Sequence, residues 1–227
     1  MNEVSPIQAV IFDFDGVIAD TEPLHYAAFC KVTAPDGLDC SWEEYVRDYI
    51  GYDDRDLFRA AYRKSGRALD ETELRRLVQT KATTFNALTA DGVATYAGIP
   101  DLVHKAADRY PVGLCSGALR SDIDPILAQL NLTKVFQVVV TAEDVPESKP
   151  DPACYRLTVR RLAERTGQSL TPADCLAIED TPGGIRSAKG AGVRVWAVTH
   201  THEASDIDHA DRVFDSLHEV RHALDEQ

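Results

Sequence analysis

Short apolar runs alternate with helix-like stretches along most of this 227-residue chain, and this alternation limits the folds open to it. The runs are short and rich in Val, Ile and Ala, as strands buried on both faces are. They lie at residues 9–12, 112–115, 135–141, 175–178 and 193–198, and a last short strand is expected at 213–214. Helical patterns lie between or after them, at residues 99–109, 121–130, 151–165, 182–191 and 217–224. Strand alternating with helix predicts an α/β fold, in which helices cover both faces of a parallel sheet.

The stretch between the first and second apolar runs breaks this rhythm. From about residue 21 to residue 95 no strand-like run occurs, and helical patterns appear instead at residues 24–32, 41–49, 55–64 and 71–88. One helix is enough to connect two parallel strands, so several indicate an inserted helical domain. The two connections between insert and core would act as the hinge of a lid. We therefore expect a core of residues 1–20 and 93–227, and an inserted all-α cap of residues 21–92.

Composition restricts the partners and the compartment. Hydrophobic residues form 44% of the chain and charged residues 27%, which is ordinary for a globular protein. The net charge of −13, without any basic run, argues against nucleic acid and anionic membranes as partners. The chain has no signal-like N-terminus and no run of about 18 apolar residues. Its five cysteines are scattered and odd in number, which favours reduced thiols and a cytoplasmic location. These features leave the oligomeric state open.

Two carboxylates, Asp13 and Asp15, follow the first apolar run and precede Gly16. On an extended strand, positions i and i+2 project from the same face, so both side chains would line one site at the carboxyl end of the strand. Two anions so close need a cation or a proton between them, which points to a divalent metal. The alternative is a polar turn after a buried strand, since Asp and Gly are both common in turns.

Three further polar clusters follow predicted core strands. They are Ser116-Gly117, Lys149-Pro150 and Glu179-Asp180. Each is weak by itself, because Ser-Gly is an ordinary turn, most lysines are solvated, and acids ahead of a helix often cap it. Ligands of open α/β sheets, however, bind at the carboxyl ends of the strands, where all these clusters would meet. The combination predicts a single site built from all of them.

At these positions the chain resembles the haloacid dehalogenase superfamily of phosphotransferases, in the branch with a helical cap inserted after the first strand. Four motifs of that family occur in order: Asp13-Phe14-Asp15-Gly16-Val17, Ser116, Lys149-Pro150 and Glu179-Asp180. The resemblance extends to Asp20-Thr21-Glu22 and to Thr181-Pro182-Gly183-Gly184-Ile185, so it spans nearly the whole chain. It implies a Rossmann-like core and a cytoplasmic, Mg²⁺-dependent phosphatase of a small phosphomonoester, similar to phosphoglycolate phosphatases and β-phosphoglucomutase-like proteins.

The resemblance also implies roles for the acidic residues. Asp13 is the family's nucleophile and forms an aspartyl phosphate that water then cleaves. Asp15 is the general acid and base, and it binds the metal through its backbone carbonyl. Asp13 and Asp180 supply side-chain oxygens to Mg²⁺, and Glu179 acts directly or through a metal-bound water. The metal lets an anionic nucleophile approach an anionic phosphoryl group.

The remaining motif residues would hold the phosphoryl group itself. Ser116 and the backbone near it, including Gly117, would bind the transferring oxygens. Lys149 would offset negative charge on both the nucleophile and the phosphate. These roles, like those of the acids, are carried over from the family.

Substrate choice is expected to lie in the cap. His25, within Thr21-Glu22-Pro23-Leu24-His25, and Lys81 match positions that β-phosphoglucomutase and many cap-bearing phosphatases share. We therefore count Thr21, His25 and Lys81 as candidate substrate or cap residues. The structural alternative is that His25 packs within the first cap helix and that Lys81 is one more solvated lysine.

The mutase pattern is incomplete in this chain. Sugar-phosphate mutases hold a distal phosphate with a cap arginine after a glycine and with a Ser-Lys pair after the second motif. Here Gly51 is followed by Tyr52-Asp53-Asp54-Arg55, and Ser116 by Gly117. These departures favour a hydrolase and leave a β-phosphoglucomutase-like phosphomutase as the alternative.

Other classes fit less well. A phospho-accepting signalling domain uses similar residues, but it is far shorter and lacks a helical insert. A noncatalytic binding protein on the same fold would normally have lost Asp13, Asp15 or Asp180, and dehalogenases work without a metal. The segment Thr199-His200-Thr201-His202 is interpreted as a polar loop rather than a metal site.

Overall fold

A parallel sheet forms the centre of the molecule in the computed structural model, which describes residues 6–227; residues 1–5, part of the predicted core and of the N-terminus considered above, lie outside that range. The described chain contains one six-stranded sheet with the order β3-β2-β1-β4-β5-β6. The strands span Ala9–Phe12 (β1), Val112–Cys115 (β2), Val138–Val140 (β3), Cys175–Glu179 (β4), Arg194–Val198 (β5) and Arg212–Phe214 (β6). Phe12 lies opposite Leu114 on β2 and Ile178 on β4. β1, β2 and β4 therefore end side by side at the carboxyl edge of the sheet.

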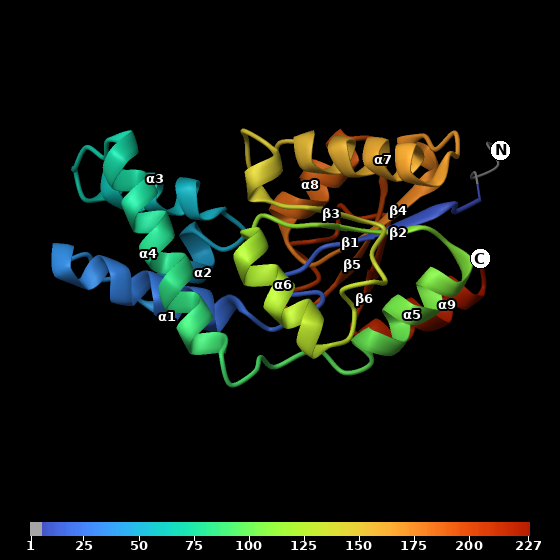
Figure 1. Cartoon of the computed structure of the whole chain (residues 1–227), viewed down its shortest axis with the longest axis horizontal. Coiled ribbons are helices and arrows are strands. Elements are labelled where there is room, and N and C mark those ends of the chain that lie inside the picture. Colours follow the sequence, from blue (N-terminus) through green and yellow to red (C-terminus); the bar gives the residue numbers. More distant parts are fainter. Residues whose placement is uncertain (1–5) are drawn as a thin grey trace.

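Helices cover both faces of the sheet, as the alternating pattern predicts (Figure 1). One layer comprises α7 (Ala153–Thr166) and α8 (Pro182–Gly190), and the other α5 (Ile99–Arg109), α6 (Arg120–Gln129) and α9 (Leu217–Asp225). Alternate residues of β1 reach opposite layers, because side chains of a strand alternate between its faces. Val10 and Phe12 join the cluster under α5, α6 and α9, while Ala9 and Ile11 pack with α7 and α8. The α/β fold predicted from the sequence is confirmed.

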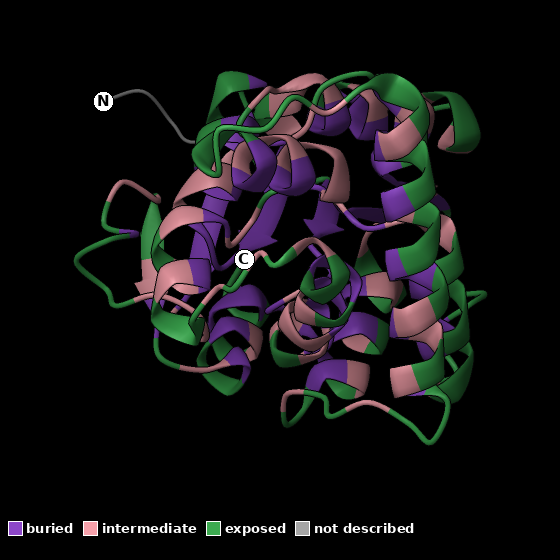
Figure 2. Cartoon of the chain, turned by 90° about the vertical axis from the view of Figure 1, so that its left-hand side faces the viewer, coloured by how far each residue is buried: buried purple, intermediate pink, exposed green. Residues whose placement is uncertain are grey.

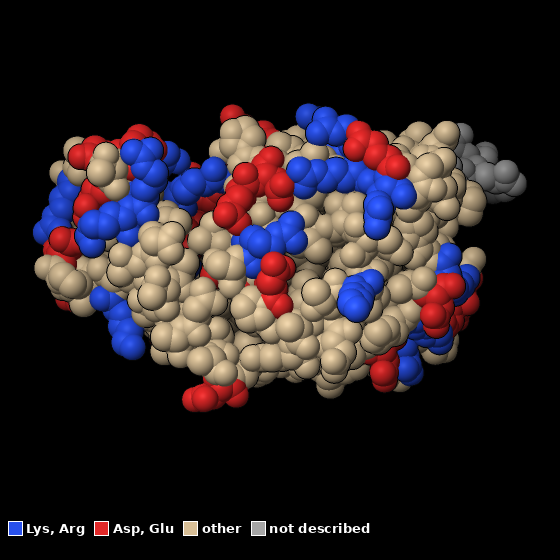
Figure 3. Space-filling view, in the orientation of Figure 1, with Lys and Arg blue, Asp and Glu red and all other residues tan. Residues whose placement is uncertain are grey.

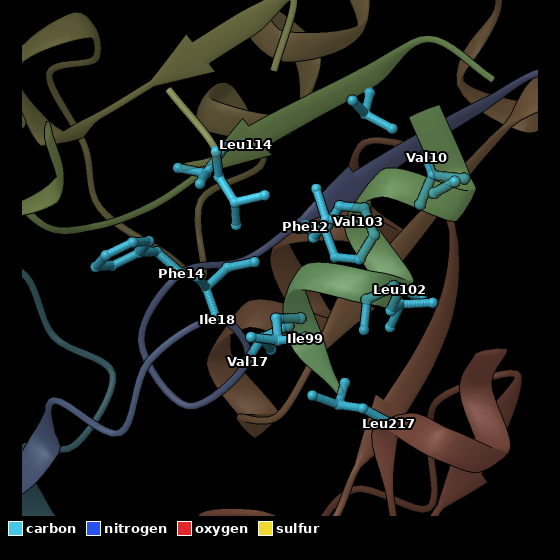
Figure 4. Close-up of a cluster of buried hydrophobic side chains, with 14 of the residues drawn as sticks. Val10, Phe12, Phe14, Val17, Ile18, Ile99, Leu102, Val103, Leu114 and Leu217 are labelled. Atoms are coloured by element: carbon cyan, nitrogen blue, oxygen red, sulfur yellow. The ribbon is translucent and has the colours of Figure 1, made fainter. Parts of the chain in front are cut away.

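The larger apolar cluster continues past the end of β1 toward the site. Figure 4 shows Phe14, Val17 and Ile18 beside Phe12, with their side chains among those of α5 and β2. All of these side chains are buried completely or almost completely. The turn that carries the first motif is thus anchored by apolar packing on the core.

The third strand is shorter than the apolar run that predicts it. The run covers residues 135–141, but the strand starts at Val138. Phe136 turns into the core and meets Phe12 edge-on, with the ring centroids 6.2 Å apart. The Gln137 side chain accepts a hydrogen bond from the backbone N–H of Val112 at 2.6 Å. The beginning of the run therefore packs against the sheet edge without extending the ladder.

The inserted helices form a separate layer beyond the carboxyl edge of the sheet (Figure 1). They are α1 (Glu22–Thr33), α2 (Trp42–Asp48), α3 (Asp54–Lys64) and α4 (Glu71–Thr89), and a short 3₁₀ helix, η1 (Ala34–Asp36), follows α1. Two further 3₁₀ helices, η2 (Ala142–Asp144) and η3 (Pro172–Asp174), belong to the core. The inserted helices have buried inner faces and exposed outer faces (Figure 2). They enclose an apolar cluster of their own, which includes Phe29, Phe58 and Leu77. This separate cluster favours the division into a cap of residues 21–92 and a core, which we retain as a proposal.

The surface carries both signs of charge. On the face shown in Figure 3, Lys and Arg side chains alternate with Asp and Glu. Several are paired; Lys64, for example, donates to Glu44 at 2.6 Å and to Asp48 at 2.7 Å. Between residues 6 and 227, no helix is both long enough and apolar enough to cross a bilayer.

Candidate active site

A buried lysine joins three of the predicted motifs at the carboxyl edge of the sheet. The Lys149 ammonium donates hydrogen bonds to Asp13 Oδ1 at 2.7 Å, to Glu179 Oε1 at 2.7 Å and to the carbonyl of Cys115 at 3.0 Å. These partners directly follow or end β1, β4 and β2. Burial alone would lower the pKa of Lys149, but the carboxylates of Asp13 and Glu179 raise it well above its usual value. The site therefore holds a fixed positive charge beside Asp13.

Three buried carboxylates crowd the same edge. Asp13, Glu179 and Asp180 each offer an oxygen atom, and these atoms all lie within 4.8 Å of one another. Burial, and then the charge of Glu179, raise the pKa of Asp13 to about 8 against the pull of Lys149. Burial and the charge of Asp13 also raise the pKa of Asp180 well above its usual value. One lysine is thus too little positive charge for three carboxylates.

The donor set fits a divalent metal ion. Asp180 Oδ1 is buried and has no hydrogen-bond partner within residues 6–227, whereas the other oxygen, Oδ2, accepts from the Thr201 hydroxyl at 2.6 Å. A buried carboxylate oxygen without a partner is costly, and a hard cation bound by carboxylates would satisfy it. The structure therefore provides oxygen ligands for a divalent cation on Asp13, Glu179 and Asp180.

Asp15 points away from this cluster, toward the cap. The strand ends at Phe12, so Asp13 and Asp15 both lie beyond it rather than on one extended strand, and the chain turns at Gly16 (φ 78°). Thr21 Oγ1 donates to Asp15 Oδ1 at 2.5 Å, and His25 Nε2 lies 3.2 Å from the same oxygen. Burial would raise the pKa of Asp15, but the hydrogen bonds from His25 and Thr21 and the positive charge of Lys81 outweigh burial and lower the pKa. Asp13 and Asp15 nevertheless line the same cavity.

The candidate cap residues form one chain of contacts behind Asp15. Lys81 Nζ lies 2.9 Å from His25 Nδ1 and forms an ion pair with Asp54. A lysine ammonium only donates, so His25 Nδ1 accepts and its Nε2–H donates to Asp15. His25 also stacks on Phe85, with the ring centroids 4.1 Å apart. Both candidates are buried at the site, so Lys81 is not a solvated surface lysine.

The second motif contributes the hydroxyl of Ser116 and, at Gly117, backbone that lines the cavity. Ser116 is buried, and its Oγ accepts a hydrogen bond from the backbone N–H of Ala118 at 2.9 Å. The same hydroxyl reaches Asp15 Oδ2 at 3.5 Å. Gly117 lines the cavity, and a Cβ there would come near only the Asp53 side chain, at 3.9 Å. Ser116 and Gly117 thus lie beside the carboxylates, within the same small volume.

Some residues of the site were not anticipated from the sequence. The segment interpreted as a polar loop supplies Thr201, which donates to Asp180, and His200, whose Nδ1–H donates to the Gly16 carbonyl at 2.7 Å. It follows β5, so the rule that found the other clusters could have found it. Tyr155, on α7, donates to Glu179 at 2.6 Å, and no sequence pattern singles out this tyrosine.

The cap closes over these residues. The cavity between Asp13 and the cap has a volume of about 40 Å³, far below the several hundred Å³ of most ligand pockets. A larger groove of about 700 Å³ lies between α3 and residues 146–152, and Tyr52 and Lys149 border both spaces. The arrangement is a closed one, with a groove adjoining the site.

Several known proteins are similar in sequence to this chain over most of its length. Protein CbbY of Cereibacter sphaeroides is 32% identical over 226 residues, covering 94% of each chain. The phosphorylated carbohydrates phosphatase of Thermotoga maritima is 29% identical and covers 86% of this chain and 87% of its own. The fructose-1-phosphate phosphatase YqaB of Escherichia coli is 27% identical, with 81% and 92% covered.

Solved structures and a family model agree with these relatives. CbbY from Rhodobacter sphaeroides, solved with phosphate, superposes with a TM-score of 0.82 at 28% identity, covering 94% of this chain and 96% of its own. The same protein was also solved, as a mutant, with xylulose-(1,5)bisphosphate. β-Phosphoglucomutase from Clostridium difficile has a TM-score of 0.82 at 23% identity, with 97% and 98% covered, and so shares the fold. The model described as haloacid dehalogenase-like hydrolase matches residues 10–198.

Proposed function

Because the chain belongs to the haloacid dehalogenase-like hydrolases, we propose that it is a Mg²⁺-dependent phosphatase that hydrolyses a small phosphomonoester through a phosphorylated Asp13. The observation that carries the proposal is the placement of Asp13, which lies in a carboxylate cluster and accepts a hydrogen bond from Lys149. Relatives that are named as phosphatases of phosphorylated carbohydrates support this substrate class. The five free cysteines, three of them buried, support action in a reducing compartment such as the cytoplasm.

The metal would be held by Asp13 and Asp180, with Glu179 nearby. When bound, Mg²⁺ neutralises negative charge on the nucleophile and on the phosphoryl oxygens. This charge would also satisfy Asp180 Oδ1 and return Asp13 to its ionised, nucleophilic form. Lys149, which donates to Asp13 Oδ1, supplies further positive charge.

The first step forms a bond between an oxygen of Asp13 and phosphorus and breaks the bond between phosphorus and the leaving oxygen. Asp15 gives its proton to that leaving oxygen. His25 and Thr21 favour the ionised form of Asp15, but an arriving phosphate adds negative charge and favours the protonated form. Ser116 and the backbone of Gly117 hold the phosphoryl oxygens during the transfer.

The second step releases phosphate. Asp15, now ionised, takes a proton from a water molecule, whose oxygen attacks phosphorus. The bond between phosphorus and Asp13 breaks, and free phosphate and the original carboxylate are restored. His25 and Thr21 position Asp15 for both steps through the hydrogen bonds that they donate to Oδ1.

A panel of phosphorylated metabolites tests the proposal. We expect the purified protein to release phosphate from at least one phosphomonoester with Mg²⁺, and to lose this activity with EDTA. Asp13→Asn should abolish turnover, lowering kcat by about 10⁴-fold or more, and leave the fold intact, because it removes the nucleophile. Equal activity of wild type and Asp13→Asn on every compound would overturn the proposal. Conversion of a sugar phosphate into an isomer without free phosphate would identify a phosphomutase instead.

A further inference from the structure

The cap wall that faces Asp13 carries more negative than positive charge. Among the described residues that line the cavity, this wall is formed mainly by Glu22 and His25 on α1, Tyr45 on α2, Tyr52, Asp54 and Leu57 on or before α3, and Lys81 on α4. A phosphate held at Asp13 places the rest of its substrate against this wall. The charges of the wall therefore act on the leaving group rather than on the transferred phosphate.

The lysine of this wall, Lys81, is already paired with Asp54. The Lys81 ammonium is almost completely buried and forms an ion pair with Asp54, whose side chain is 14% exposed. Its other contact is His25 Nδ1, at 2.9 Å. A second anionic group in the cavity would have to compete with Asp54 for Lys81.

The nearest arginine, Arg55, does not supply a positive charge for a second anionic group in the cavity. Arg55 follows Asp54 in the chain, but its Nε donates to Asp53 at 2.9 Å and its terminal nitrogens approach the Val145 carbonyl at 3.4 Å. It borders the neighbouring groove and not the cavity. The second carboxylate of the wall, Glu22, accepts a hydrogen bond from Tyr45 at 3.1 Å and has no lysine or arginine partner among the described residues. Among the residues that the structure describes, an additional anion would thus meet two carboxylates and no unpaired lysine or arginine on this wall.

We propose that Asp54 is a specificity-determining residue that restricts the leaving group to uncharged polyols, such as the sugar part of a sugar monophosphate, and rejects substrates with a second phosphate or a carboxylate. The inference rests on the proposed phosphatase function. Hydroxyl groups can donate to Asp54 and Glu22, whereas a second phosphate can only accept from protonated partners. Like charges placed together at a binding surface oppose binding and set specificity.

Matched pairs of substrates test this inference. Fructose 1-phosphate and glucose 1-phosphate are each compared with the corresponding bisphosphate, which differs by one distal phosphate. We expect wild type to prefer the monophosphate by about 100-fold in kcat/KM, and Asp54→Asn to reduce this preference by about ten-fold, because the variant removes one negative charge and frees Lys81. Glu43→Gln, which removes an exposed carboxylate of α2, is the matched control and should leave the preference unchanged.

Each result decides the inference. A wild type that uses both members of a pair equally, or a folded Asp54→Asn with the wild-type preference, would overturn the role of Asp54 and leave the phosphatase function standing. Absence of hydrolysis from every mono- and bisphosphate would instead overturn the proposed function itself. Should circular dichroism show that Asp54→Asn is unfolded, Glu22→Gln tests the same wall: a reduced preference supports the inference, and an unchanged one contradicts it.

Discussion

The orientation and protonation of single side chains in this site depend on the charged groups that they contact. Lys149 is one cation with three acceptors, and the same ammonium therefore orders Asp13, Glu179 and the end of β2. His25 is defined by its neighbours on both sides, because the donor-only Lys81 sets the tautomer that donates to Asp15. Removing one member of such a buried set leaves its partner uncompensated, which is more damaging than losing an exposed pair.

Asp122 gives a pH-dependent prediction at this scale. It is buried in the first turn of α6 and accepts from Ser121 at 3.2 Å and from Asn86 at 3.4 Å. Burial raises the pKa of Asp122 to about 6 from its ordinary value of 3.8. The folded protein therefore binds this proton more tightly than the unfolded chain, and the stabilisation from it is lost as the pH rises through about 6.

We expect Asp122→Asn to remove this loss. The free energy of unfolding of the variant, relative to wild type, should increase by about 2 kcal/mol between pH 4.5 and pH 7.5. Urea denaturation at several pH values measures it. Asp124→Asn, which alters an exposed acid of the same helix, should show no such trend. A difference between Asp122→Asn and wild type that does not change with pH would contradict the prediction.

At the scale of elements, the turns after the strands determine the site more than the strands do. The turn after β1 brings Gly16 against the turn after β4, and the loop after β5 closes on both through Thr201 and His200. α8 begins so close to Glu179 that a Cβ at Gly184 would lie 2.0 Å from its carboxylate. These turns must therefore combine polar side chains with backbone that has no side chain at all.

Gly16→Ala tests this close packing. An added Cβ would lie 1.8 Å from Asp180 Oδ2, and the φ of 78° is unfavourable for alanine. We expect phosphatase activity to fall by about 100-fold or more, because Asp180 must move and the metal site is distorted. Gly37→Ala is the matched control, since Gly37 has a similar φ of 66° but open space around its Cβ position. It should lose about 1 kcal/mol of stability and keep its activity. Wild-type activity in Gly16→Ala would show that the turn has more freedom than the structure indicates.

The whole molecule is a core and a cap in contact across the site. The Ser148 hydroxyl donates to Asp56 on α3, and Arg55 approaches the Val145 carbonyl, so the cap is fastened to the loop that carries Lys149. A cavity of about 40 Å³ holds only a few water molecules, and a sugar phosphate cannot enter it as it stands. Substrate entry and product release therefore require the cap and core to separate.

A reversible cross-link across this interface tests the need for opening. With Asp56→Cys and Ser148→Cys together, a disulfide would join the two side chains that are in contact in the closed form. We expect oxidation to abolish turnover and dithiothreitol to restore it. Each single variant and the wild type, treated in the same way, control for oxidation of the native cysteines. Full activity in a protein shown by mass spectrometry to be cross-linked would contradict the requirement for opening.

Particular residues show how far the sequence reaches. The apolar runs predict β1, β2 and β4 closely, because strands buried on both faces need continuous apolar residues, and the parallel sheet follows from the alternation with helices. The predicted start of β3 was wrong, since Phe136 packs against Phe12, far away in the chain. Asp13 and Asp15 line one cavity, as predicted, but the sequence did not specify that Asp15 would meet Thr21 and His25. Thr201 could have been found from its place after β5, whereas Tyr155 joins the site without a local signal of its own.

The sequence by itself determined the fold class, the inserted helical layer and the order in which the motif residues reach the carboxyl edge of the sheet. Hydrophobic periodicity is a property of neighbouring residues, so it can be recognised in the sequence without the structure. Only the tertiary structure decided that Lys81 is neutralised by Asp54, that His25 donates to Asp15 and that one oxygen of Asp180 has no partner in the described part of the chain. Those properties arise from contacts between distant segments inside a buried space, where the free energy of each charge depends on every neighbour at once.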